Sequence, residues 1–147
     1  MTHIEKLTEK ISNYIPLTKS MNLKVVSIED QSVELFAPLE ANKNHMNSAF
    51  GGSLYTVAVL SCWGLTEEIL EVTGIIPKYT MIKSGHIDYL KPVRGDFAAK
   101  SHAHKQDIDA FLLGLSRKQL ARIQMTSEIF YNGDVCARLV GEFVTAL

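Results

Sequence analysis

The longest uncharged segment of the chain, residues 46–66, constrains the fold more than any other feature. It runs for 21 residues without an acidic or basic side chain, which is the length of a bilayer span. Asparagine, serine, threonine and glycine interrupt it, however, and the chain has no second segment of this kind. We therefore expect a helix buried inside a soluble domain, not a membrane anchor.

Length and composition fit one domain over residues 1–147. The chain is 46% hydrophobic with a formal net charge of −1, so it can bury a sizeable core and gives no electrostatic reason to expect a nucleic-acid partner. Cys62 and Cys136 have neither metal-ligand nor redox spacing and are expected to be buried free thiols. Together with an N-terminus that lacks a signal-peptide pattern, this predicts a cytoplasmic protein.

Hydrophobic spacing predicts two helices in the first half of the chain. An amphipathic helix over 4–15 should end at Pro16, and 23–39 should form two strands around a turn near 30–32. A second helix should run from about Gly51 to Thr73, with Gly74 as its C-cap. Its first four turns are apolar on all sides, so they must be covered everywhere. Only its last turns are expected to reach water, through Glu67, Glu68 and Glu71.

The second half reads mostly as strands. Residues 77–90 and 96–104 flank the turn "KPVRG", and 122–147 form a hairpin whose turn is Asn132-Gly133. A short amphipathic helix should follow Asp107. One apolar helix with five or six mainly antiparallel strands predicts an α+β domain in which the sheet curls around the helix.

Two stretches resemble a known superfamily. "NHMNSAFGGSLY" (44–55) resembles the Asn-x-x-Gly-x-x-His-Gly-Gly pattern of hotdog-fold acyl-CoA thioesterases, and "HIDYLKPVRGD" (86–96) resembles a strand-turn signature of many hotdog proteins. With an extra helix near 107–119, the chain is most similar to the thioesterase-type domain often fused behind a GNAT acetyltransferase domain, here free-standing. The likeness runs from about residue 10 to the C-terminus.

This resemblance implies a hotdog fold that hydrolyses thioesters of coenzyme A or acyl-carrier protein. It also implies a homodimer or a dimer of dimers with sites between subunits, and no cofactor. The chain departs from the pattern at Asn47, in place of glycine, and at Phe50, in place of histidine. The helix carboxylate expected about nine residues later is absent, since that region reads Val59-Leu60-Ser61-Cys62.

The candidate catalytic groups lie around the glycine pair. The main-chain N–H groups of Gly51 and Gly52, at a helix start, could form an oxyanion hole; the alternative is a helix start packed tightly on a strand. Asn44 could orient water or the thioester, or cap its own turn. His45 could act as general base or simply be solvated. Ser61 could be a nucleophile, although no base is visible beside it, and core packing is the alternative.

The candidate substrate-binding residues are Asn42, Phe50, Tyr55, His86, Asp88, Lys91 and Arg94. His86 and Asp88 share a strand face and could polarise water across a subunit interface, or form an exposed ion pair. Lys91 and Arg94 could meet coenzyme A phosphates, or form a solvated basic turn. His102 and His104 also share a face, but no third side chain has metal-ligand spacing, so no metal is expected.

Three functions therefore remain open from the sequence. A thioesterase comes first. A non-catalytic module that binds acyl thioesters comes second, because the family carboxylate is missing. A dehydratase comes third, and it requires His86 and Asp88 to lie near the start of the Gly51 helix.

Overall fold

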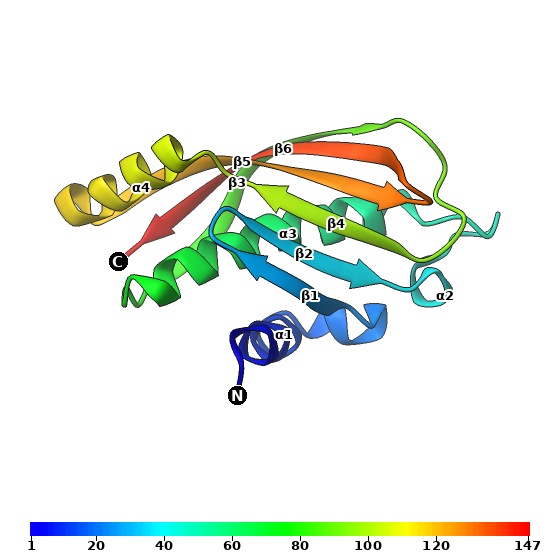
Figure 1. Ribbon diagram of the computed structural model, residues 1–147, viewed down its shortest axis with the longest axis horizontal. Coiled ribbons are helices and arrows are strands. Elements are labelled where there is room, and N and C mark those ends of the chain that lie inside the picture. The colour runs from blue at the N-terminus through cyan, green and yellow to red at the C-terminus, as the bar shows by residue number, and fades with distance from the viewer.

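The computed structural model describes residues 1–147 and places one six-stranded sheet over a long central helix (Figure 1). The strands are β1 (Lys24–Glu29), β2 (Ser32–Ala37), β3 (Tyr79–Tyr89), β4 (Phe97–His102), β5 (Leu120–Tyr131) and β6 (Asp134–Ala146). The helices are α1 (His3–Tyr14), the 3-10 helix η1 (Pro16–Met21), α2 (Leu39–Asn42), α3 (Gly51–Val72) and α4 (Lys105–Lys118).

The strands follow the order β1-β2-β4-β5-β6-β3, and all neighbours are antiparallel. This confirms the predicted α+β architecture. The β5–β6 turn is also as predicted, because Asn132 and Gly133 have φ values of 53° and 81°, as a tight primed hairpin turn requires. Sheet order puts β1 and β3 at the two edges.

Helix α3 is the centre of the core. Val57, Ala58, Cys62 and Leu65 on it are fully buried. The expectation that its first four turns are covered on every side is wrong, however, because Tyr55, Thr56 and Val59 are only half-buried and Gly52 is exposed. The predicted cap is confirmed, since Gly74 has a φ of 72° and the Ile75 N–H donates to the Leu70 oxygen at 2.9 Å. No helix, α3 included, is long and apolar enough to cross a membrane.

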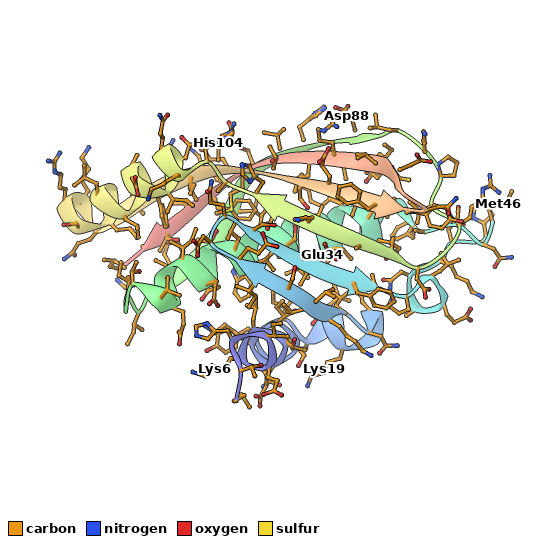
Figure 2. All side chains as sticks on the ribbon, in the orientation of Figure 1. Lys6, Lys19, Glu34, Met46, Asp88 and His104 are labelled. Carbon is orange, nitrogen blue, oxygen red and sulfur yellow. The ribbon has the colours of Figure 1, made fainter.

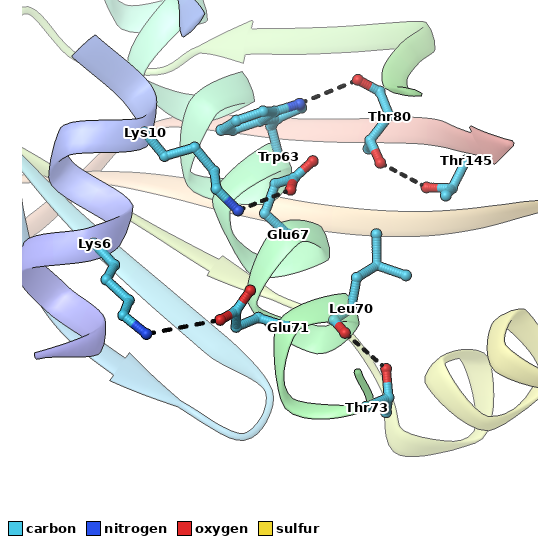
Figure 3. A network of polar contacts seen from close by, with 9 residues as sticks. All are labelled: Lys6, Lys10, Trp63, Glu67, Leu70, Glu71, Thr73, Thr80 and Thr145. Atoms are coloured by element: carbon cyan, nitrogen blue, oxygen red, sulfur yellow. Dashed lines mark hydrogen bonds and ion pairs between the residues drawn. The ribbon is translucent and has the colours of Figure 1, made fainter. Parts of the chain in front are cut away.

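Helix α1 covers the C-terminal half of α3, which corrects one prediction. Glu67 and Glu68 are buried, and only Glu71 is at the surface. Lys10 pairs with Glu67 at 3.4 Å and His3 pairs with Glu68; Figure 3 shows the Lys10–Glu67 pair. The prediction was wrong because helical periodicity shows which face is apolar, not which other helix will pack over a polar one.

Short helices complete the fold. The helix predicted after Asp107 is α4, which packs on β5 through the buried Phe111 and Leu115. Helices η1 and α2 fall in segments for which no helix was predicted. A side-chain hydrogen bond also links α3 to β3, since the Trp63 indole N–H donates to the Thr80 oxygen at 3.1 Å (Figure 3).

Candidate functional site

The start of α3 presents main-chain N–H groups that have no acceptor within the chain. Phe50 is the N-cap residue, and its side chain makes no capping hydrogen bond. The N–H groups of Gly51, Gly52 and Ser53 therefore stay unpaired, and the first paired one is that of Leu54, which donates to the Phe50 oxygen at 3.0 Å. Such groups carry the positive end of the helix dipole and bind developing negative charge.

The loop before α3 is shaped by Asn44. Its Oδ1 accepts from the N–H groups of Met46 and Ser48 at 2.8 and 3.2 Å, and its Nδ2 donates to the Ser48 hydroxyl at 3.0 Å. Both ends of the amide are thus used within the loop. Asn44 holds the approach to the glycines in place, which is the turn-capping alternative, and one hydrogen of its Nδ2 has no partner within the chain.

Asn42 anchors the same loop from the protein interior. Its side chain is buried and donates to the Met21 and Pro38 oxygens at 3.0 and 2.9 Å. Its main-chain oxygen accepts from the Phe50 N–H at 2.8 Å. The prediction that Asn42 binds substrate is therefore wrong, because the side chain faces the protein interior and fixes the entry into α3.

Two aromatic rings flank the glycine pair. The ring of Tyr89 lies 3.5 Å from the position that a Cβ of Gly51 would take, and its hydroxyl donates to the Gly51 oxygen at 2.8 Å. A Cβ at Gly52 would collide with the ring of Phe50. The hydroxyl of Tyr55 lies against Gly85 of β3. The rings of Phe50 and Tyr89 thus lie beside the glycine pair, whereas the Tyr55 side chain contacts β3.

Sequence reasoning did not single out Tyr89, although it belongs to the quoted stretch "HIDYLKPVRGD". The available signal was its place at the strand end of that motif. Burial raises the pKa of Tyr89, and the neighbouring Tyr55 adds to the rise. The Tyr89 hydroxyl therefore stays protonated and acts as a donor at neutral pH.

A hollow of about 260 Å³ opens beside these groups, between the start of α3 and the loop after β3. Gly51, Leu54, Tyr89 and Lys91 are among the residues that line it. A larger hollow, of about 610 Å³, lies between α1, η1 and the β1–β2 hairpin. We place the candidate site at the smaller one, because it borders the unpaired N–H groups at the start of α3.

Ser61 and Cys62 belong to the core instead of the site. The Ser61 hydroxyl is fully buried, donates to the Ala58 oxygen and shares a second hydrogen bond with Ser127, both at 2.7 Å. Burial raises the pKa of Cys62 to about 12, so its thiol does not ionise near neutral pH. The structure supports the packing alternative for Ser61 and gives no support for a nucleophile.

His86 and Asp88 point away from the start of α3. Gly85, Ile87 and Tyr89 contact the α3 side or the core, so the alternating residues lie on the opposite face of β3. Figure 2 shows Asp88 on that outer side. The two side chains form an exposed pair at 3.1 Å. The dehydratase hypothesis required these two side chains to lie near the start of α3, and the structure does not support it.

Of the remaining candidates, only Lys91 lines the hollow. It also pairs with Asp134 at 3.5 Å. Arg94 is exposed and forms no ion pair, and His45 is exposed on the loop that leads into α3. His102 and His104 lie edge to face, 5.0 Å apart, and no group of three metal-ligating side chains exists.

Solved structures share this architecture over nearly the whole chain. A protein of unknown function from Chlorobaculum tepidum TLS is 28% identical, with a TM-score of 0.91 and 97% and 93% of the two chains covered. A structure described as a putative thioesterase from Shewanella oneidensis is 25% identical, with a TM-score of 0.90 over 99% and 98%. The probable thioesterase PA5026 from Pseudomonas aeruginosa, at 18% identity, a TM-score of 0.79 and coverage of 97% and 94%, shows the shared fold alone.

The similarity extends from fold to family. A family model described as "Putative thioesterase (yiiD_Cterm)" matches residues 4–147, which include the α3 start, Tyr89 and the hollow between them. The chain has the hotdog fold and belongs to this thioesterase family.

Proposed function

We propose that the protein hydrolyses acyl thioesters of coenzyme A or of acyl-carrier protein at the start of α3. One observation carries the proposal: the N–H groups of Gly51, Gly52 and Ser53 are unpaired at the start of α3, where Gly51 lines an open hollow. Family membership supports thioester hydrolysis in general, and the two carriers are the sources of thioester that we propose.

In this mechanism the thioester carbonyl approaches the two glycines. Its oxygen accepts hydrogen bonds from the Gly51 and Gly52 N–H groups while water attacks the carbonyl carbon. Negative charge on that oxygen grows in the tetrahedral intermediate, so the donors stabilise the transition state more than the substrate. The intermediate then collapses, the C–S bond breaks, and the thiol leaves with a proton.

Different residues would bind the acyl group and the phosphate-bearing carrier of the substrate. The Phe50 and Tyr89 rings provide apolar surface next to the reacting carbonyl. Lys91 and Arg94 lie on the loop after β3 and could meet the phosphates of either carrier, since phosphate attracts lysine and arginine side chains. In this proposal the exposed Arg94, which has no competing carboxylate, contributes more than Lys91.

His45 is our candidate for the group that activates water. It lies on the loop that leads into α3 and has no hydrogen-bond partner within the chain. A neutral imidazole nitrogen can accept the proton of an attacking water. No carboxylate of the same chain lines the hollow beside the glycines, and His45 is the histidine nearest to them in sequence.

We further propose that two copies associate through the edge of β3. This strand pairs only with β6, and Met81 and Ile82 on it are exposed by 52% and 36%. Unpaired edge strands readily pair with another chain. A hollow of about 260 Å³ is smaller than the roughly 300–1,000 Å³ of most ligand sites, so a second copy would complete it.

Purified protein with a panel of acyl-CoA and acyl-carrier-protein substrates tests the activity, with released thiol trapped by a dye. We expect turnover on at least one chain length and a smaller kcat for His45→Gln. The absence of thiol release across the panel would contradict hydrolysis. Size-exclusion chromatography with light scattering tests the assembly, and a monomer would contradict the proposed pairing.

A non-catalytic acyl-thioester binding module is the second candidate. The observation that favours it is the missing helix carboxylate, for which the structure offers no substitute within α3, because Ser61 and Cys62 are buried. Thermal unfolding separates the two functions. A Tm increase with acyl-CoA, together with no released thiol, would favour binding alone, whereas thiol release excludes it.

A further inference from the structure

The hydroxyl of Tyr89 reaches the first peptide group of α3 from a different element. It donates to the Gly51 oxygen from the last position of β3, 38 residues along the chain. The Thr56 hydroxyl, by comparison, donates to the Gly52 oxygen at 2.8 Å from one helical turn away, which is an ordinary local contact. The Tyr89 contact therefore depends on tertiary structure.

Peptide planarity connects this hydrogen bond to the Gly52 N–H. The Gly51 carbonyl and the Gly52 N–H belong to one trans peptide unit, in which the two groups point in opposite directions. Fixing the oxygen toward Tyr89 therefore fixes the N–H toward the open end of the helix. A carbonyl oxygen has two lone pairs, so it can accept from Tyr89 as well as from the helix.

The same hydrogen bond changes the strength of the donor. A peptide whose oxygen accepts a hydrogen bond becomes more polarised, and its N–H becomes a better donor in turn. Two consecutive glycines at a helix end need such support, because glycine restricts its own backbone least. A capping side chain would also order the helix start, but it would occupy the free N–H groups. The Tyr89 hydroxyl binds the Gly51 oxygen instead and leaves those N–H groups available.

We propose that Tyr89 is a positioning residue of the thioester site, which acts through the Gly51 oxygen to set the direction and strength of the Gly52 N–H. The inference rests on the proposed function, since it assigns that N–H to the thioester oxygen. Tyr89 needs no contact with the reacting atoms for this role. Its hydroxyl remains a donor across the neutral pH range, as its raised pKa requires.

Replacement of Tyr89 by phenylalanine tests the proposal, because the ring on Gly51 is kept and only the hydroxyl is lost. We expect kcat to fall by about 10-fold or more, toward the roughly 10²–10³-fold effect of a lost oxyanion donor. KM should change less than about twofold, as for an interaction made only in the transition state. Wild-type kcat in Tyr89→Phe would overturn the proposal.

Tyr131→Phe is the matched control. The ring of Tyr131 also packs on a glycine, Gly95, but its hydroxyl makes no hydrogen bond. We expect wild-type kcat and KM from this variant. An equal loss of kcat in both variants would overturn the proposal, because it would assign the effect to the general packing of tyrosine on glycine.

Amide spectra of ¹⁵N-glycine-labelled protein give a readout that does not depend on turnover. The chain has nine glycines, and we expect Tyr89→Phe to shift the Gly52 amide while Gly64, in the middle of α3, stays in place. If the wild-type protein hydrolyses no thioester, the proposed function fails, and the Gly52 amide alone tests the positioning. A shift then supports it, and an unmoved resonance overturns it.

Discussion

The two ends of α3 are built in opposite ways. At the N-terminal end the N–H groups of Gly51, Gly52 and Ser53 are unpaired and no charged residue caps the helix. At the C-terminal end the last carbonyls are capped through Gly74 and Ile75, and α1 covers the acidic turns. Carboxylates near a helix C-terminus oppose the helix dipole, and the cations of α1 offset this. Tertiary contacts thus close the C-terminal end of α3, whereas the N-terminal end keeps its donors available for the proposed chemistry.

The largest effect on activity should come from deleting a donor at the N-terminal end of α3. Gly51→Pro removes one N–H, and proline suits the first helical position; Phe50 already has a φ of −63° and a ψ of 133°, which suits a residue before proline. We expect kcat/KM to fall by about 10²–10³-fold. Urea denaturation should show little change in the free energy of unfolding.

Gly51→Ala is the comparison variant for this experiment. It adds a Cβ at an ordinary 3.5 Å from the Tyr89 ring and keeps the N–H. Its loss of kcat/KM should be much smaller than that of Gly51→Pro. Equal activities for the two variants would show that the Gly51 N–H is not a donor to the substrate.

At the covered end, the largest effect should come from Lys10. Lys10→Met leaves Glu67 buried without its cation, and an unpaired buried charge is costly. We expect a loss of about 2 kcal/mol in the free energy of unfolding, since the Lys10 side chain is 27% exposed and solvent screens part of the pair. Adding Glu67→Gln should restore most of it. A stable Lys10→Met single variant would show that this ion pair does not hold α1 on α3.

A smaller loss of stability should follow from uncapping α1. Thr2 and Glu5 form a capping box, in which the Glu5 N–H donates to the Thr2 hydroxyl at 3.1 Å. Thr2→Ala should cost about 1 kcal/mol, measured by urea denaturation. Ser12→Ala, which removes an exposed hydroxyl of the same helix, should leave stability unchanged; a matching loss in both would argue against the cap.

The smallest effect belongs to the outermost ion pair. Lys6 and Glu71 lie 4.0 Å apart, and both side chains are about half exposed (Figure 3). Lys6→Ala should change the free energy of unfolding by no more than about 0.5 kcal/mol. A loss comparable with that of Lys10→Met would mean that burial does not determine how much each ion pair at this end of α3 contributes to stability.

Local patterns predicted most of the fold, because hydrophobic spacing and turn residues act over a few positions. The Asn132-Gly133 turn and the Gly74 cap needed no distant partner. The cover over Glu67 could not be predicted, since it depends on how α1 packs against a segment more than fifty residues away. At the site, the glycine pair was identifiable from the motif, whereas Tyr89 reaches it only through the sheet, and the buried position of Asn42 depends on oxygens of other segments.

The two edges of the sheet differ in how well they are covered, and this difference would limit the number of copies that can associate. The Thr8 hydroxyl of α1 accepts from the Val25 N–H at 3.4 Å, so α1 covers the β1 edge, while β3 has no such cover. Strand addition through β3 would use up the only open edge of each copy, and a two-fold pair would close without a third strand to recruit. Helix α1 would thus serve as a terminator that keeps pairing from growing into a fibre.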